Sequence, residues 1–486
     1  MTADLSTAPL LAAFDAEAFR RQGHAIVDLL ADHLAAAHER SGAVLPWQPP
    51  DALRERWAHP FAANGGGEPA LRDTLAAYLA ATTSLHHPRF VGHQVTPPLP
   101  AAALAELVSA FANSSGAVYE MGPAAMAAEL AVLRWMATTL GLGPGAEGLL
   151  TSGGSLGNLT ALLAARRAAA GFDAWRDGCA AGPPLAILAG EGAHYSVARA
   201  AQIMGLGAAG VVTVPVDARL RLDATALAPT LDAATRAGRR AFAVVASACT
   251  TAAGIYDPLE AVAEFCREHG LWLHVDGAHG AGAALSPRYR HLVAGIERAD
   301  SVVWDAHKML LMPSLVSGVL FREGRRAWES FSQEAAYLIG NSGAEEWYNL
   351  SHRTIECTKN AMSLKLYAAL RAAGPALLAA HVEHAYDLAR RFATLIEEAG
   401  DFELAAPPES NIVCFRHVPT GLRVPDAELD ALQERVRRRI IESGAFYLVQ
   451  ARLRGRLYLR TALMNPLTEE SDLSALLETI RRAGRS

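Results

Sequence analysis

Leu271-Trp-Leu-His-Val-Asp276 is a short apolar run that ends in a carboxylate, and Ser301-Val-Val-Trp-Asp-Ala-His-Lys308 is a second run that ends in an amine. Runs of this length between polar or glycine residues indicate buried β-strands. From residue 147 to residue 325 such runs alternate with helical patterns, which predicts an α/β fold with a mostly parallel central sheet covered on both faces. The predicted strands are 148–150, 185–189, 210–214, 241–246, 271–275, 301–304 and 317–321, and the predicted helices between them are 155–170, 194–204, 223–238 and 257–269.

The regions on either side have different patterns. Residues 14–39 are typical of an amphipathic helix, and Leu45-Pro-Trp-Gln-Pro-Pro50 breaks the chain after it. A helix that is cut off in this way must bury its apolar stripe against another unit or another subunit. After a helical pattern at 356–400, short predicted strands at 412–415 and 457–461 lie among predicted helices at 425–442 and 468–483. We predict a dimer-packing N-terminal helical segment (1–80), a large α/β domain (81–365) and a small C-terminal α+β domain (366–486).

The composition is that of a soluble globular enzyme. The 486 residues are 51% hydrophobic and 19% charged, and the net charge of −6 with scattered Lys and Arg argues against nucleic-acid binding. Five widely spaced cysteines, an odd number without a CxxC pair, predict a reducing compartment. Because the first residues lack a basic region before an apolar core, and no uncharged apolar stretch reaches ~20 residues, we expect a cytoplasmic protein without a membrane span.

Lys308 and Asp276 both follow predicted strands, where parallel sheets bind their ligands. A lysine in a nearly uncharged stretch is expected to have a lowered pKa and to act as a nucleophile, and the carboxylate suits a pyridinium partner. This pair predicts pyridoxal 5′-phosphate (PLP), which needs a lysine for a Schiff base and an acid at its ring nitrogen. The alternatives are an exposed surface lysine and a metal site at His274, Asp276 and His279, although no metal-binding spacing supports the latter.

Thr151-Ser-Gly-Gly-Ser-Leu-Gly-Asn158 opens a predicted helix after a strand. Its glycines would let backbone N–H groups approach a phosphate, and the helix dipole would favour the anion. An ordinary strand-to-helix turn would have the same pattern. His194 begins another predicted helix, where its ring could stack on a cofactor or simply cap the helix.

Together these segments resemble the group II pyridoxal-dependent decarboxylases, which are fold-type I enzymes acting on amino acids. The likeness covers nearly the whole chain, and some segments are most similar to bacterial diaminobutyrate-decarboxylase-like members. It rests on His87-Pro-Arg-Phe90, Gly92-His-Gln94, Ala117-Val-Tyr-Glu-Met-Gly-Pro123, Thr151-Ser-Gly-Gly154, Ala193-His194, Thr250-Thr251, His274-Val-Asp-Gly-Ala278, His307-Lys308, Arg353-Thr-Ile-Glu-Cys-Thr-Lys359, Leu459-Arg460 and Asn465-Pro466.

The resemblance implies a role for each matched residue. Lys308 would form the Schiff base and Asp276 would pair with the pyridine nitrogen, while His194 and Ala278 would lie on the two faces of the ring. Thr251 would hydrogen-bond near the ring, backbone groups of Gly154, Ser155 and Leu156 would hold the phosphate, and His307 would lie nearby. Arg460 would contact the substrate α-carboxylate, and His93 and Gln94 are further candidates for the substrate pocket.

The chain departs from the family pattern at Asp305-Ala306, where Asn-Pro is frequent, and at Gly277, where alanine is frequent. The family's mobile loop usually carries a tyrosine that donates a proton to the substrate carbon. Tyr337 and Tyr348 both lie in the corresponding glycine-containing region, residues 330–350, and spacing does not choose between them. If neither acts, His194 is the next candidate donor.

The predicted function is therefore PLP-dependent α-decarboxylation of a small-molecule L-amino acid by a cytoplasmic homodimer with active sites near the subunit interface. An aminotransferase or lyase on the same fold is the first alternative, since it would share the lysine, the aspartate and the phosphate loop. A non-catalytic relative is the second, although it would have no need for Lys308 and Asp276.

Overall fold

The computed structural model describes residues 7–63, 65–329, 331, 348–421 and 424–485. The α-helices are α1 (Ala8–Ala12), α2 (Ala16–His38), α3 (Pro50–Trp57), α4 (Gly67–Ala81), α5 (Pro100–Ala112), α6 (Pro123–Leu140), α7 (Gly154–Ala169), α8 (Ser196–Ile203), α9 (Leu227–Arg236), α10 (Leu259–His269), α11 (Arg325–Glu329), α12 (Ser363–Ala399), α13 (Asp426–Ser443) and α14 (Glu470–Arg485). None of these helices within the described ranges is long and apolar enough to cross a membrane.

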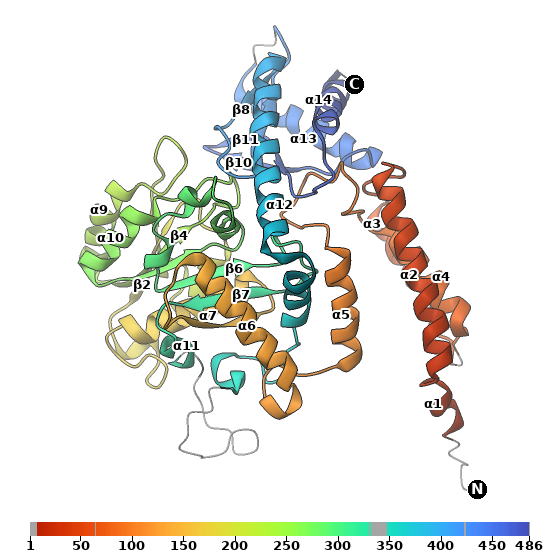
Figure 1. Ribbon diagram of the computed structural model, residues 1–486. Coiled ribbons are helices and arrows are strands. Elements are labelled where there is room, and N and C mark those ends of the chain that lie inside the picture. Colours follow the sequence, from red (N-terminus) through yellow and green to blue (C-terminus); the bar gives the residue numbers. More distant parts are fainter. Residues whose placement is uncertain (1–6, 64, 330, 332–347, 422–423, 486) are drawn as a thin grey trace.

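A large sheet lies at the centre of the molecule, and it confirms the predicted α/β class (Figure 1). Its seven strands run in the order β1-β7-β6-β5-β4-β2-β3, and β7 is antiparallel to both of its neighbours while the other pairs are parallel. Each predicted strand forms at its expected place. The strands are β1 (Glu147–Thr151), β2 (Leu185–Gly190), β3 (Val211–Val214), β4 (Arg240–Ser247), β5 (Trp272–Asp276), β6 (Ser301–Asp305) and β7 (Ser317–Phe321).

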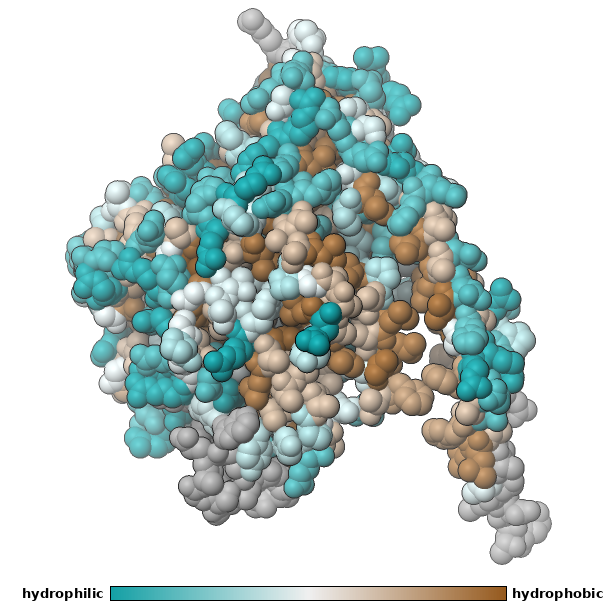
Figure 2. All heavy atoms as spheres, in the orientation of Figure 1, coloured by the Kyte–Doolittle hydropathy of each residue, from teal (hydrophilic) through white to brown (hydrophobic). Residues whose placement is uncertain are grey.

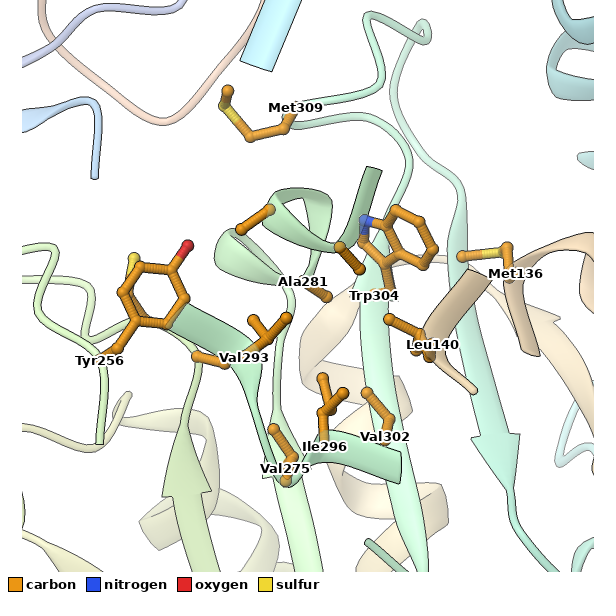
Figure 3. Close-up of a cluster of buried hydrophobic side chains, with 14 of the residues drawn as sticks. Met136, Leu140, Tyr256, Val275, Ala281, Val293, Ile296, Val302, Trp304 and Met309 are labelled. Carbon is orange, nitrogen blue, oxygen red and sulfur yellow. The ribbon is translucent and has the colours of Figure 1, made fainter. Parts of the chain in front are cut away.

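Alternating side chains of β5 and β6 pack into two different cores, because successive residues of a strand point to opposite faces. On one face Val275, Val302 and Trp304 pack with residues of α6 and of the 3-10 segment Gly280–Leu285 (Figure 3). On the other face Val303 contacts Gly157 of α7. His274, Asp276 and Asp305 share the face of Val303 by the same alternation, so their polar groups are directed toward α7.

The C-terminal unit is built on a second, antiparallel sheet in the order β10-β11-β9-β8. Its strands are β8 (Phe402–Leu404), β9 (Ile412–His417), β10 (Val449–Leu453) and β11 (Arg456–Ala462). Helix α12 connects the two sheets and bends at Gly374, whose φ of 74° interrupts the helix just before Pro375 (Figure 1). The predicted domain boundary at residues 365 and 366 falls inside α12. The division into domains stays a prediction.

The N-terminal helices lie along one side of the molecule (Figure 1). Helix α2 begins at the N-cap Asp15, whose side chain accepts a hydrogen bond from the Ala18 backbone N–H at 2.6 Å. It packs on α4, and its Phe19 ring lies 5.1 Å from the Phe111 ring of α5. The apolar stripe of α2 is nevertheless only partly covered, because Phe19, Val27 and Leu30 remain exposed.

Candidate active site

The sequence-predicted site residues follow strands whose carboxyl ends meet at one edge of the large sheet. Asp276 ends β5 and Lys308 follows β6, while Thr251 follows the parallel neighbour β4. Strand β1 is antiparallel to β7, as β6 is, so the start of α7 after β1 lies at this edge too. Ligands of open parallel sheets bind at such an edge.

Asp276 is buried and held by two hydrogen bonds. The Asn158 side-chain amide of α7 donates to Asp276 Oδ2 at 2.9 Å, and the Ala278 backbone N–H donates to Oδ1 at 3.2 Å. Neither of these donors is a cation. The carboxylate therefore keeps a fixed orientation without being neutralised by these contacts, as a partner for a positively charged group requires.

Asn158 also belongs to a chain of buried polar side chains that ends at His194. Its amide donates to Ser196 Oγ at 2.8 Å, and Ser196 Oγ lies 2.8 Å from His194 Nδ1. Since the Ser196 hydroxyl accepts from Asn158, its own hydrogen is available for His194 Nδ1. Burial lowers the pKa of His194, so the neutral ring is favoured, with its proton on Nε2.

The opposite side of Asn158 is fixed in the same way. His274 Nε2 lies 3.0 Å from Asn158 Oδ1, and His274 Nδ1 lies 2.9 Å from Ser301 Oγ. Burial lowers the pKa of His274 to about 4, so this ring is neutral and donates from Nε2 to the Asn158 oxygen. The amide nitrogen of Asn158 is thereby directed at Asp276 and Ser196. Asn158 was not among the site residues predicted from the sequence. The signal that could have identified it is a polar residue one helical turn after Gly154.

Lys308 lies beside two acids rather than in an apolar setting. Its Nζ is 3.1 Å from Asp305 Oδ2, and His307 Nε2 is 3.6 Å from the same oxygen. Burial lowers the pKa of Lys308, but the carboxylates of Asp305 and Asp276 outweigh this effect and raise it above the ordinary value. The predicted lowered pKa is therefore wrong. The sequence around Lys308 is nearly uncharged, but Asp305 lies three residues before it and Asp276 ends the neighbouring strand β5.

The first turn of α7 has the geometry of an anion cradle. Gly153 adopts a φ of 119°, which favours glycine, and α7 begins at the next residue. Backbone N–H groups in a first helical turn have no partner within the helix. Those of Gly154, Ser155 and Leu156 are in this position, so they could hold a phosphate at the same edge as Lys308 and Asp276.

Arg460 of β11 reaches this edge from the small sheet. It is buried, and its guanidinium donates to the Thr251 carbonyl at 2.7 Å, the Ala252 carbonyl at 3.1 Å and Gln94 Oε1 at 3.1 Å. Among the residues that the structure describes, no carboxylate forms an ion pair with Arg460, and the buried Gln94 Nε2 has no hydrogen-bond partner. The hydrogen bond from Arg460 to the Thr251 carbonyl holds the backbone of Thr251 at this edge. His93 is exposed, and its ring lies 5.7 Å from the ring of Tyr447.

Of the two predicted proton donors, Tyr337 and Tyr348, only Tyr348 is among the residues that the structure describes. Tyr337 and most of the region 330–350 lie outside the described residues. Tyr348 is half-buried, and its ring lies 5.4 Å from the ring of Tyr119, edge to face. The role of either tyrosine as the proton donor stays a prediction.

The donors and acceptors at this edge fit PLP: an amine, a buried carboxylate, a neutral imidazole and a glycine-led helix N-terminus. Comparison with known proteins agrees. The pyridoxal-dependent decarboxylase conserved domain matches residues 70–418. Cysteine sulfinic acid decarboxylase of Rattus norvegicus is 30% identical over 92% of this chain and 92% of its own length. Aromatic-L-amino-acid decarboxylase of Bacillus atrophaeus is 28% identical over 96% and 95%.

Solved structures show the same relationship. The crystal structure of mouse CSAD has a TM-score of 0.91 at 27% identity, covering 97% of this chain and 99% of that one. The glutamate decarboxylase domain of the Vibrio parahaemolyticus diaminobutyrate-pyruvate transaminase and L-2,4-diaminobutyrate decarboxylase has a TM-score of 0.83 at 25% identity, covering 100% and 97%. This chain belongs to the pyridoxal-dependent decarboxylase family. It is a fold-type I, PLP-dependent carboxy-lyase that decarboxylates an amino acid, as the sequence predicted.

Asn158→Ala should impair turnover more than cofactor binding. The change leaves Asp276 Oδ2 and His274 Nε2 without their partners, and each loss of a buried hydrogen bond costs about 1–3 kcal/mol. We expect kcat to fall on the order of 10–100-fold while PLP remains bound, measured by amine release and by absorbance of the purified protein. Asn158→Asp should be at least as damaging, because it places a second carboxylate against Asp276. Unchanged kcat in both variants would contradict a positioning role for Asn158.

Proposed function

We propose that this enzyme converts an L-amino acid to its amine and CO2 through a Schiff base on Lys308. In this proposal Asp276 pairs with the ring nitrogen of PLP, and Arg460 binds the substrate carboxylate. The observation that carries the proposal is the convergence of Lys308, Asp276 and the start of α7 at one sheet edge. A buried arginine without a described carboxylate partner faces the same edge.

Bound PLP supplies an aldehyde that takes up the substrate amine and a ring that accepts the electron pair left when CO2 departs. Asp276 would hold a proton on the ring nitrogen by a charge-assisted hydrogen bond, because its two present donors are neutral and leave its charge uncompensated. His194, with its proton on Nε2, would pack against one face of the bound ring, and Ala278 would lie against the other. The N–H groups of Gly154, Ser155 and Leu156 would hold the phosphate, with His307 nearby, and Thr251 would contact the ring edge.

Arg460 binds the substrate carboxylate. The guanidinium is fixed by the Thr251 and Ala252 carbonyls, so it is orientated before the substrate arrives. Gln94 Nε2, which has no hydrogen-bond partner among the described residues, offers one more donor beside it, and the exposed His93 would belong to the outer wall of the pocket. The proton that replaces CO2 at the substrate carbon comes from Tyr337 or Tyr348, and a well-placed donor contributes roughly 10²–10⁴-fold to the rate.

Lys308→Ala should abolish attachment of PLP and nearly all turnover. Borohydride reduction of the wild-type holoenzyme followed by peptide mapping should place the pyridoxyl label on Lys308. Lys359, which is buried in an ion pair with Glu129, is the matched control lysine and should carry no label. Label on another lysine would falsify the assignment.

A panel of L-amino acids then defines the reaction. Release of CO2 with the amine supports decarboxylation, and formation of a keto acid would indicate an aminotransferase instead.

We also propose that the enzyme is a homodimer of the cytoplasm with active sites near the subunit interface. All five cysteines are unpaired, which suits a reducing compartment. Hydrophobic side chains gather on α5 and on the adjacent side of α2 (Figure 2). The members on α5 are Leu104, Leu107, Val108 and Phe111, each more than half exposed, and Phe111 is 73% exposed. A contiguous apolar surface of this kind indicates a protein interface.

Leu107→Glu combined with Phe111→Glu should therefore produce a monomer, because two charges would be desolvated in the interface. Sedimentation analysis should give a dimer for the wild type and a monomer for the double variant. Ile203→Glu, a similar change at a 64% exposed residue of α8, is the control and should remain dimeric. A wild-type monomer, or a dimer of unchanged stability in the double variant, would contradict this interface.

A further inference from the structure

Asp305 lies where the site described above gives it no role. It ends β6 and its side chain is 2% exposed. One carboxylate oxygen, Oδ2, is 3.1 Å from Lys308 Nζ. The other, Oδ1, is buried and has no hydrogen-bond partner among the described residues. Because an isolated buried carboxylate is costly, the charge of Asp305 depends on Lys308 for its compensation.

The same carboxylate touches the start of α7. A Cβ atom built on Gly154 would lie 2.9 Å from Asp305 Oδ2 and 3.0 Å from Oδ1, so the acid rests against the glycine that opens the helix. This is the turn whose N–H groups are proposed to bind the phosphate. Asp305 therefore stands between the lysine that would bond to the cofactor and the backbone that would hold it.

We propose, on the basis of the proposed function, that Asp305 is a positioning residue that holds Lys308 as an ammonium and so sets the pH range in which this lysine combines with PLP. Formation of the Schiff base requires the Lys308 ammonium to lose a proton to solvent. The free amine then forms a bond to the aldehyde carbon, C=N replaces C=O, and the oxygen leaves as water. Asp305 opposes the first of these steps because it stabilises the charged amine.

Other groups that face Lys308 do not replace Asp305 in this role. Burial raises the pKa of the Cys249 thiol to about 12 and lowers that of His279 to about 3, so both are neutral near pH 7. His194 is favoured in its neutral form, and His307 Nε2 lies 3.6 Å from Asp305 Oδ2. Asp276 also favours the ammonium, but its oxygens are bonded to Asn158 and Ala278. The cation Arg460 acts in the opposite direction, since it disfavours a second positive charge.

The test is the rate at which the full-length chain, freed of PLP, takes up added PLP between about pH 6 and about pH 9. Absorbance at about 420 nm reports the product, and borohydride fixation with mass spectrometry reports the fraction of PLP on Lys308. The wild-type rate should rise with pH. In Asp305→Asn the same rise should occur at lower pH, and the rate near pH 7 should increase on the order of tenfold, because the opposing charge is gone. Pyridoxal, which lacks the phosphate, should show the same pH shift.

Asp300→Asn is the matched control. Asp300 lies just before β6, at its other end, and pairs with Arg322 at 2.6 Å, so its variant should retain the wild-type pH profile. An unchanged profile or slower uptake in Asp305→Asn would overturn the inference. If the Asn variant does not fold, Asp305→Ser removes the same charge and carries the same expectation. Failure of the wild type to attach PLP to Lys308 at any pH would instead refute the proposed function.

Discussion

The hydrogen bond from Asn158 to Asp276 is the interaction on which the organisation of the site depends. It joins α7, whose first turn is the anion cradle, to the end of β5. The same amide is fixed by His274 and reaches His194 through Ser196. A single buried side chain thus sets the direction of the acid and the tautomer of the imidazole. Neutral donors do this without cancelling the charge that Asp276 needs for a pyridinium.

The sheet geometry explains why two acids with different roles lie so close together. Asp276 and Asp305 end neighbouring parallel strands and point to the same face, so both approach α7. Their partners separate them. Asp276 is bound by an amide and a backbone N–H, whereas Asp305 is compensated by Lys308. The charge of Asp276 thus stays available for a ligand, whereas the charge of Asp305 is compensated by Lys308 of the protein itself.

The sequence was sufficient for the large sheet because buried parallel strands are continuous apolar runs bounded by turn residues, as at 301–304. It also placed Lys308 and Asp276 at a common edge, since strand ends carry the ligands of such sheets. It missed β8 and β10, the two edge strands of the small sheet, because partly exposed edge strands such as Phe402–Leu404 have no strong apolar pattern. It also gave the wrong direction for the Lys308 pKa, because the sequence does not show that the carboxylates of Asp305, three residues earlier, and Asp276, on the neighbouring strand, lie close to the amine.

The most direct test of the account is the protonation state of the cofactor ring nitrogen. PLP labelled with ¹⁵N at that atom can be bound to the wild type and to Asp276→Asn, and the nitrogen chemical shift compared at neutral pH. A carboxylate held by neutral donors should keep the ring nitrogen protonated in the wild type, and the amide variant should leave it unprotonated with strongly reduced turnover. A protonated ring nitrogen in both proteins, with similar turnover, would contradict the role assigned to Asp276.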